Sequence, residues 1–226
     1  MNTKDTPAQS DSAQPFQSLA ASDVRNVFGK AVILAGSVIE AVRADQLENQ
    51  TPCDDFTTRQ MIQHLIGVLE RIAVVGTGKS PFTVSGMAGD VSDDALVTAW
   101  NAHVAGVVGV WSDDLVLTNQ LLVPWGSDTG AVALTRYVNE VSVHTWDLAR
   151  ATGQKPDWDA DVLGVAYEAM TTLLPREGRR EIYDAARASM PPEMAANFKD
   201  PFVDPIDLGV GASAIDRLVA FSGRQP

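Results

Sequence analysis

Apolar residues recur every three or four positions over most of the chain, which is the spacing of one face of an α-helix. The first such segment begins at Ser22 and is predicted to end near Asp45. The second begins at Thr57, because a threonine followed three residues later by Gln60 forms a capping box. It should end within residues 76–78, where glycines tolerate the left-handed exit from a helix.

The same spacing continues through the rest of the chain, with one interruption. Between residues 115 and 130 two short apolar stretches flank a glycine-containing turn, which predicts a small hairpin. Further helices are predicted over residues 92–111, 133–152, 160–174 and 214–221. The pattern therefore predicts an all-α fold with a hairpin insertion.

Composition divides the chain into three predicted parts. Residues 1–20 are mostly rich in Ser, Gln, Asp and Thr and should form a disordered tail. Residues 21–175 should form the helical bundle. Residues 176–226 are interrupted by prolines and should form a C-terminal extension packed on the bundle.

Charge and composition exclude several classes of partner. The 226-residue chain is 45% hydrophobic and has a net charge of −12, with its basic residues scattered, so we expect no nucleic-acid partner. No apolar run reaches the ~20 residues that cross a bilayer. The single cysteine, Cys53, cannot form an internal disulfide, and the polar N-terminus lacks a signal core. We therefore expect a cytoplasmic protein without a membrane partner.

A candidate metal site emerges from two helical segments. Glu140 and His144 are four residues apart, so they project from the same face of their helix. His64 lies on the inward half of the second helix and is a candidate third ligand. Three ligands leave a position for water or substrate, as in catalytic sites, and this N,N,O set suits zinc, nickel, iron, cobalt or manganese. The alternative is that Glu140 and His144 form an ordinary helical pair.

Other polar residues have less specific interpretations. His103 has no carboxylate or histidine at helical spacing and should lie at the surface or at a pocket rim. Asp147 could be a fourth ligand, could accept a hydrogen bond from a metal-bound histidine, or could pair with Arg150 or Arg179. Cys53 is predicted to be a packed or capping residue rather than a reactive thiol, because no histidine is near it in the sequence.

Three separated blocks of sequence resemble a known family. They are Thr51-Pro-Cys-Asp-Asp-Phe-Thr-Thr-Arg-Gln-Met-Ile-Gln-His64, Pro124-Trp-Gly, and Glu140-Val-Ser-Val-His144-Thr-Trp-Asp-Leu-Ala-Arg-Ala-Thr-Gly153. In this order they resemble the N-terminal domain of mycothiol-dependent maleylpyruvate isomerases, within the DinB-like metal-binding bundles. The resemblance spans roughly residues 24–174, and the last eleven residues are similar to those of one subgroup of the family.

The resemblance implies an up-down four-helix core that holds one divalent ion, usually zinc, through His64, Glu140 and His144. It also implies mycothiol as a cosubstrate, whose thiol would be deprotonated at the metal and would attack an electrophilic substrate in a transferase or isomerase reaction. A homodimer is expected by analogy. Alternatives are a metal-binding stress-response or ligand-binding module without turnover, and a metal-dependent hydrolase.

The chain departs from the family at its C-terminus. Residues 176–226 look too short to match the isomerases' C-terminal domain, which contributes to their active site. The isomerase substrate is therefore not carried over. Arg176, Arg179, Arg180 and Arg187 could bind a carboxylate, but we predict that they form a solvated basic helix face.

Overall fold

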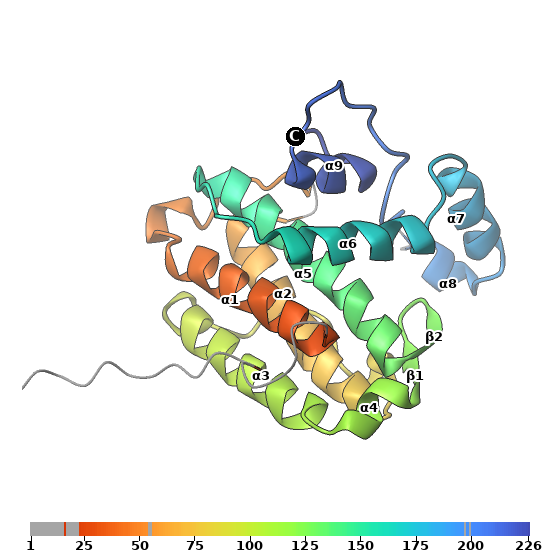
Figure 1. The fold of residues 1–226 in the computed structure, drawn as a ribbon, viewed down its shortest axis with the longest axis horizontal. Helices are drawn as coiled ribbons and strands as arrows, with labels where there is room; N and C mark the ends of the chain where they lie inside the picture. The colour runs from red at the N-terminus through yellow and green to blue at the C-terminus, as the bar shows by residue number, and fades with distance from the viewer. Residues whose placement is uncertain (1–15, 17–22, 54–55, 197, 199) are drawn as a thin grey trace, which may run out of the picture.

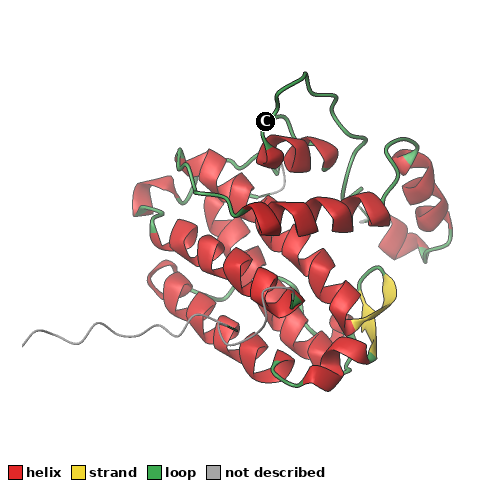
Figure 2. Cartoon of the chain, in the orientation of Figure 1, coloured by secondary structure: helices red, strands yellow, loops and turns green. Residues whose placement is uncertain are grey.

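The computed structural model describes residue 16 and residues 23–53, 56–196, 198 and 200–226. Figure 2 shows that helices make up most of this part of the chain, so the predicted all-α class is confirmed. The predicted tail lies outside the described residues except for Phe16, which is buried. No described helix is both long enough and apolar enough to span a membrane. The α-helices are α1 Val24–Glu40, α2 Thr58–Gly76, α3 Leu96–Trp111, α4 Asp114–Thr118, α5 Gly130–Thr152, α6 Ala160–Leu173, α7 Arg179–Ala188, α8 Pro192–Ala195 and α9 Ala214–Phe221.

Four of these helices form a ring around the main core. Helix α1 packs against α3 and α5, and α2 packs against the same two helices from the other side. Helix α6 packs on α5 and α1, and α9 in turn lies beside α6 (Figure 1). Because α2 and α5 are in contact, polar residues on their facing sides are brought together inside the bundle.

The predicted helix ends are largely those of the structure. Thr57 caps α2 and exchanges hydrogen bonds with Gln60, and Gly153 ends α5 in the left-handed conformation, with φ of 70°. The first helix is shorter than predicted, because it ends at Glu40 and a 3₁₀ turn follows at residues 44–46. The side chain of Gln46 stabilises this turn, since it accepts a hydrogen bond from the Arg43 amide and donates one to the Thr152 carbonyl.

The predicted hairpin is present, although a short helix precedes it. Strand β1, Gln120–Val123, pairs antiparallel with β2, Gly126–Thr129. Gly126 has a φ of 134°, a conformation that other residues rarely adopt. The hairpin leads directly into α5 and places Trp125 beside that helix, where its ring contacts the ring of Tyr137.

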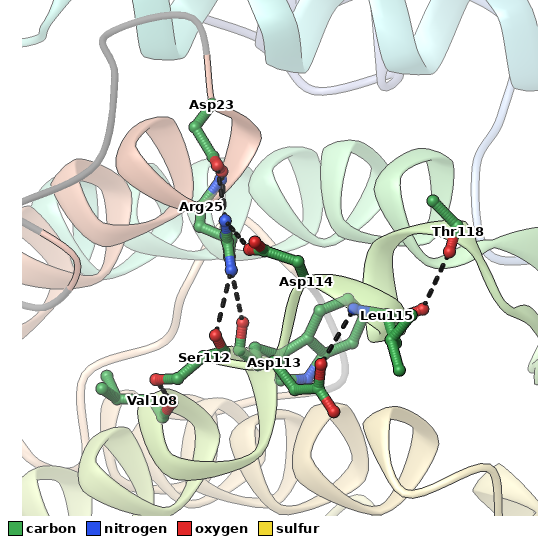
Figure 3. A network of polar contacts seen from close by, with 9 residues as sticks. Asp23, Arg25, Val108, Ser112, Asp113, Asp114, Leu115 and Thr118 are labelled. Carbon is green, nitrogen blue, oxygen red and sulfur yellow. Dashed lines mark hydrogen bonds and ion pairs between the residues drawn. The ribbon is translucent and has the colours of Figure 1, made fainter.

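A buried arginine ties the start of α1 to the end of α3 (Figure 3). Arg25 is only 3% exposed, and its guanidinium has several hydrogen-bond partners. It pairs with Asp23 and Asp114 at 2.7 Å each and donates to the carbonyl oxygens of Trp111 and Ser112. These bonds satisfy the buried charge and hold the connection between α3 and α4.

Replacing Arg25 with methionine should lower the free energy of unfolding by about 2–3 kcal/mol. The substitution removes the guanidinium bonds to Oδ2 of Asp23 and to the Trp111 carbonyl, and a buried polar group that loses its hydrogen bond is costly. Chemical denaturation followed by circular dichroism measures the change. Arg43→Met is the control, because Arg43 is exposed and pairs with the exposed Asp45; an equal loss in both variants would contradict the prediction.

The C-terminal segment corrects one prediction. Arg179 is fully buried rather than part of a solvated face. It donates hydrogen bonds at 2.8 Å to the carbonyl oxygens of Pro175, Val203 and Phe221. The prediction was wrong because helical spacing does not show that residues 203 and 221 fold back over the start of α7.

Candidate metal centre

The three predicted ligands come together between α2 and α5. His64 projects from α2, and Glu140 and His144 project from successive turns of α5. One potential ligand atom from each lies within 4.8 Å of the other two. The Nε2 atoms of His64 and His144 are 3.5 Å and 3.8 Å from Oε1 of Glu140, and the two imidazole rings meet edge to face.

The loop between α2 and α3 fixes the orientation of His64. Nδ1 of His64 donates a hydrogen bond to the carbonyl oxygen of Gly86 at 3.0 Å. Since a carbonyl oxygen can only accept, Nδ1 carries the proton, and the lone pair of Nε2 is directed toward Glu140. The ring of Phe56 stacks on the imidazole at 5.1 Å and limits its rotation further.

A close approach between two glycines holds this loop in place. A Cβ atom on Gly67, one turn after His64, would lie 2.3 Å from the backbone carbon of Gly86. The amide of Ala88 also donates to the carbonyl of Gln63 at 3.0 Å. The absence of a side chain at Gly67 therefore allows the Gly86 backbone, and with it the carbonyl that binds His64, to lie close to α2.

His144 is oriented by a carboxylate. Its Nδ1 lies 3.0 Å from Oδ2 of Asp147, which directs Nε2 toward Glu140. Asp147 is completely buried and pairs with Arg224 through two hydrogen bonds of 2.8 and 2.9 Å. Its carboxylate is therefore used as an acceptor, one of the predicted roles, but its cationic partner is neither Arg150 nor Arg179.

The turn that follows α9 brings Arg224 to Asp147. Gly223 has a φ of 82°, and the Arg224 amide donates to the carbonyl of Val219, which closes the end of the helix. A Cβ atom on Gly223 would lie 2.4 Å from a methyl group of Val203. The C-terminal segment thus contributes directly to the surroundings of the site.

Charges and burial act in opposite directions on the ionisable groups. Burial would raise the pKa of Glu140, but the nearby imidazoles of His64 and His144 and the guanidinium of Arg71 lower it to about 2. Burial lowers the pKa of His144 and outweighs the hydrogen bond with Asp147. Burial likewise opposes ionisation of Asp147, yet His144 and Arg224 keep its pKa below the usual value.

The donor geometry fits a small divalent ion. Zinc–nitrogen and zinc–oxygen bonds of about 2.0–2.2 Å place tetrahedral ligand atoms roughly 3.4 Å apart. The two His–Glu separations of 3.5 and 3.8 Å are close to this value. Both histidines also have the oriented ring and acceptor partner that metal-binding histidines usually have. His64, Glu140 and His144 could therefore hold a metal with little rearrangement.

Sequence reasoning missed that Cys53 approaches this centre. Its sulfur and potential ligand atoms of His144 and Asp147 lie within 4.8 Å of one another. No histidine is near Cys53 in the sequence. In the structure His144 is near it, because the loop before α2 folds over the end of α5. His103 belongs to neither group of candidate ligands, and its Nδ1 donates to the Ala99 carbonyl within α3.

Comparisons with known proteins identify relatives of this chain. Two uncharacterized proteins from Mycobacterium tuberculosis, strains CDC 1551 / Oshkosh and ATCC 25618 / H37Rv, are each 29% identical over 188 residues. Each alignment covers 83% of this chain and 90% of the relative. No solved structure matches the chain.

A family model matches half of the chain. Residues 35–149 match the model described as the mycothiol maleylpyruvate isomerase N-terminal domain, and this range contains His64, Glu140 and His144. The match agrees with the all-α, DinB-like bundle of the structure, a fold that generally binds divalent metals. The chain therefore belongs to the mycothiol maleylpyruvate isomerase N-terminal domain family.

Proposed function

We propose that this protein is a metal-dependent enzyme in which His64, Glu140 and His144 hold one divalent ion, with zinc as the first candidate. The cosubstrate would be mycothiol, whose thiol would attack an electrophilic small molecule in a transferase or isomerase reaction. The observation that carries this proposal is the orientation of both imidazoles, whose Nδ1 atoms have oxygen partners while their Nε2 atoms face Glu140.

The ion would supply Lewis acidity, which favours the thiolate form of a coordinated thiol at neutral pH. The residues of the chain supply the rest. Gly86 and Asp147 keep the two histidines in the tautomer that has a lone pair on Nε2. Glu140 is the most exposed of the three candidate ligands, with 26% of its side chain accessible, so a small molecule would reach the site from its side. Attack by sulfur forms a carbon–sulfur bond, either by addition to an activated double bond or with departure of a leaving group.

Protein purified without a chelator or a polyhistidine tag should contain about one equivalent of metal. The His64→Ala variant should lose it, because two of three ligands do not retain an ion at a site of this kind. Elemental analysis of both proteins measures the difference. His103→Ala is the matched control, since His103 lies outside the candidate ligand groups and should retain full metal content. Absence of metal after reconstitution with zinc would refute the metal centre.

The thiol is tested separately from the metal. The zinc-loaded protein should accelerate the reaction of mycothiol with an electrophile such as 1-chloro-2,4-dinitrobenzene, measured as formation of the dinitrophenyl thioether with loss of chloride. The His64→Ala variant should not. A rate that does not depend on thiol would favour the hydrolase, and tight thiol binding without turnover across a set of electrophiles would favour the binding module.

A further inference from the structure

Two further polar residues lie beyond the candidate metal ligands on the same two helices, α2 and α5. Arg71 follows His64 by two turns on α2, and Tyr137 precedes His144 by two turns on α5. His64 meets His144, and Arg71 is within electrostatic range of Tyr137, so the two helices run antiparallel and Arg71 and Tyr137 are the next polar residues along them. Glu140 lies between the two pairs and interacts with both His64 and Arg71.

Both residues of this second pair have buried polar atoms without a partner. Tyr137 is 2% exposed, and its hydroxyl has no hydrogen bond to any described residue. Nε of Arg71 is also buried without a partner among the described residues, and Nη2 has only a long bond of 3.4 Å to the Ser85 carbonyl. A buried hydroxyl normally finds an acceptor, because leaving it unpaired is costly.

The backbone around Arg71 is shaped to admit its guanidinium. Gly86 has a φ of 71°, and a Cβ atom there would lie 1.8 Å from Nη2 of Arg71. The same residue supplies the carbonyl oxygen that binds His64. One loop residue therefore positions both a metal-ligand candidate and a cation, which places Arg71 within the same site.

We propose that Arg71 and Tyr137 form an oxyanion subsite that binds a carboxylate or enolate oxygen of the molecule held at the metal centre. An oxyanion accepts hydrogen bonds from both groups and so satisfies the atoms that the protein leaves unpaired. Arg71 forms no ion pair with another described residue. The negative charge of Glu140, its neighbour, is balanced by the metal when one is bound, which leaves the guanidinium to attract a second anion. The inference rests on the proposed function, since the subsite serves the ligand of that metal.

The test uses two thiols that differ in one charge, 3-mercaptopropionate and 3-mercaptopropionamide. Each is titrated into the full-length protein loaded with Co²⁺, and the thiolate-to-cobalt absorption band reports binding of sulfur without any need for turnover. We expect the carboxylate to bind about tenfold more tightly than the amide, the size of one charge-assisted hydrogen bond. The Tyr137→Phe and Arg71→Gln variants should lose this preference while still showing the absorption band.

Tyr137→Phe also separates binding from folding. It removes only an unpaired hydroxyl, so the denaturation midpoint should stay the same or rise while the preference for the carboxylate falls. Tyr183→Phe, which removes a buried hydroxyl from α7, should change neither preference nor band. Equal binding of the two thiols by the original protein, or an unchanged preference in Tyr137→Phe, would overturn the subsite and leave the metal centre intact. Failure to bind Co²⁺ or either thiol would overturn the proposed function, and the subsite with it.

Discussion

Replacing Gly67 with alanine is expected to lower the free energy of unfolding by about 2–3 kcal/mol and to weaken zinc binding by roughly 10- to 100-fold. The added methyl group would lie 2.3 Å from the Gly86 carbon and 2.5 Å from the Met87 nitrogen. These are backbone atoms, so the loop must move away from α2. That movement weakens the bond between Gly86 and His64, and the imidazole loses the partner that sets its tautomer.

The two effects are measured by denaturant unfolding of the metal-free protein and by competition for zinc with a chromophoric chelator. Gly106→Ala is the control for the chemical change itself. Gly106 lies within α3, and a Cβ atom there has no neighbour within 4 Å, so alanine should stabilise the helix by about 0.4–1 kcal/mol. A Gly67→Ala variant at least as stable as the original protein would mean that the loop does not hold His64 through the Gly86 carbonyl.

The parts of the fold that depend on local sequence could be predicted. The capping box at Thr57 and the glycine at position 153 mark helix ends because they satisfy backbone groups within a few residues. The spacing of Glu140 and His144 places both on one helix face whatever surrounds them. The predicted bounds of the final helix, Ala214–Phe221, are those of the structure for the same reason.

The features that the sequence did not reveal join residues far apart in the chain. Asp147 meets Arg224 across 77 positions, and no periodicity selects one arginine over another. Cys53 approaches His144 only because the loop before α2 folds over the end of α5. The candidate ligands could be found because the chain has only three histidines and one of them follows a glutamate by one helical turn, whereas their supporting residues become apparent only in three dimensions.

Replacing Arg224 with glutamine should cost about 3–5 kcal/mol of folding free energy, more than either Gly67→Ala or Arg25→Met. Asp147 is 0% exposed, so removing the guanidinium leaves a buried carboxylate with His144 as its remaining partner. Because the pKa of Asp147 is lowered in the folded protein, the stabilisation by this pair should be complete above pH ~4. It should be lost as the pH falls through the lowered value, and the difference between variant and original should shrink there.

A denaturation series over pH checks both the size and the sign of this effect. Arg217→Gln removes the same charge from an exposed arginine of α9 and should change stability by less than about 0.5 kcal/mol. Adding Asp147→Asn to Arg224→Gln should cost less than the sum of the two single changes, because the second substitution removes the charge that the first left unpaired. Additive losses, or a loss no larger than that of Arg217→Gln, would mean that the C-terminal segment does not support the histidine at the metal centre through Asp147.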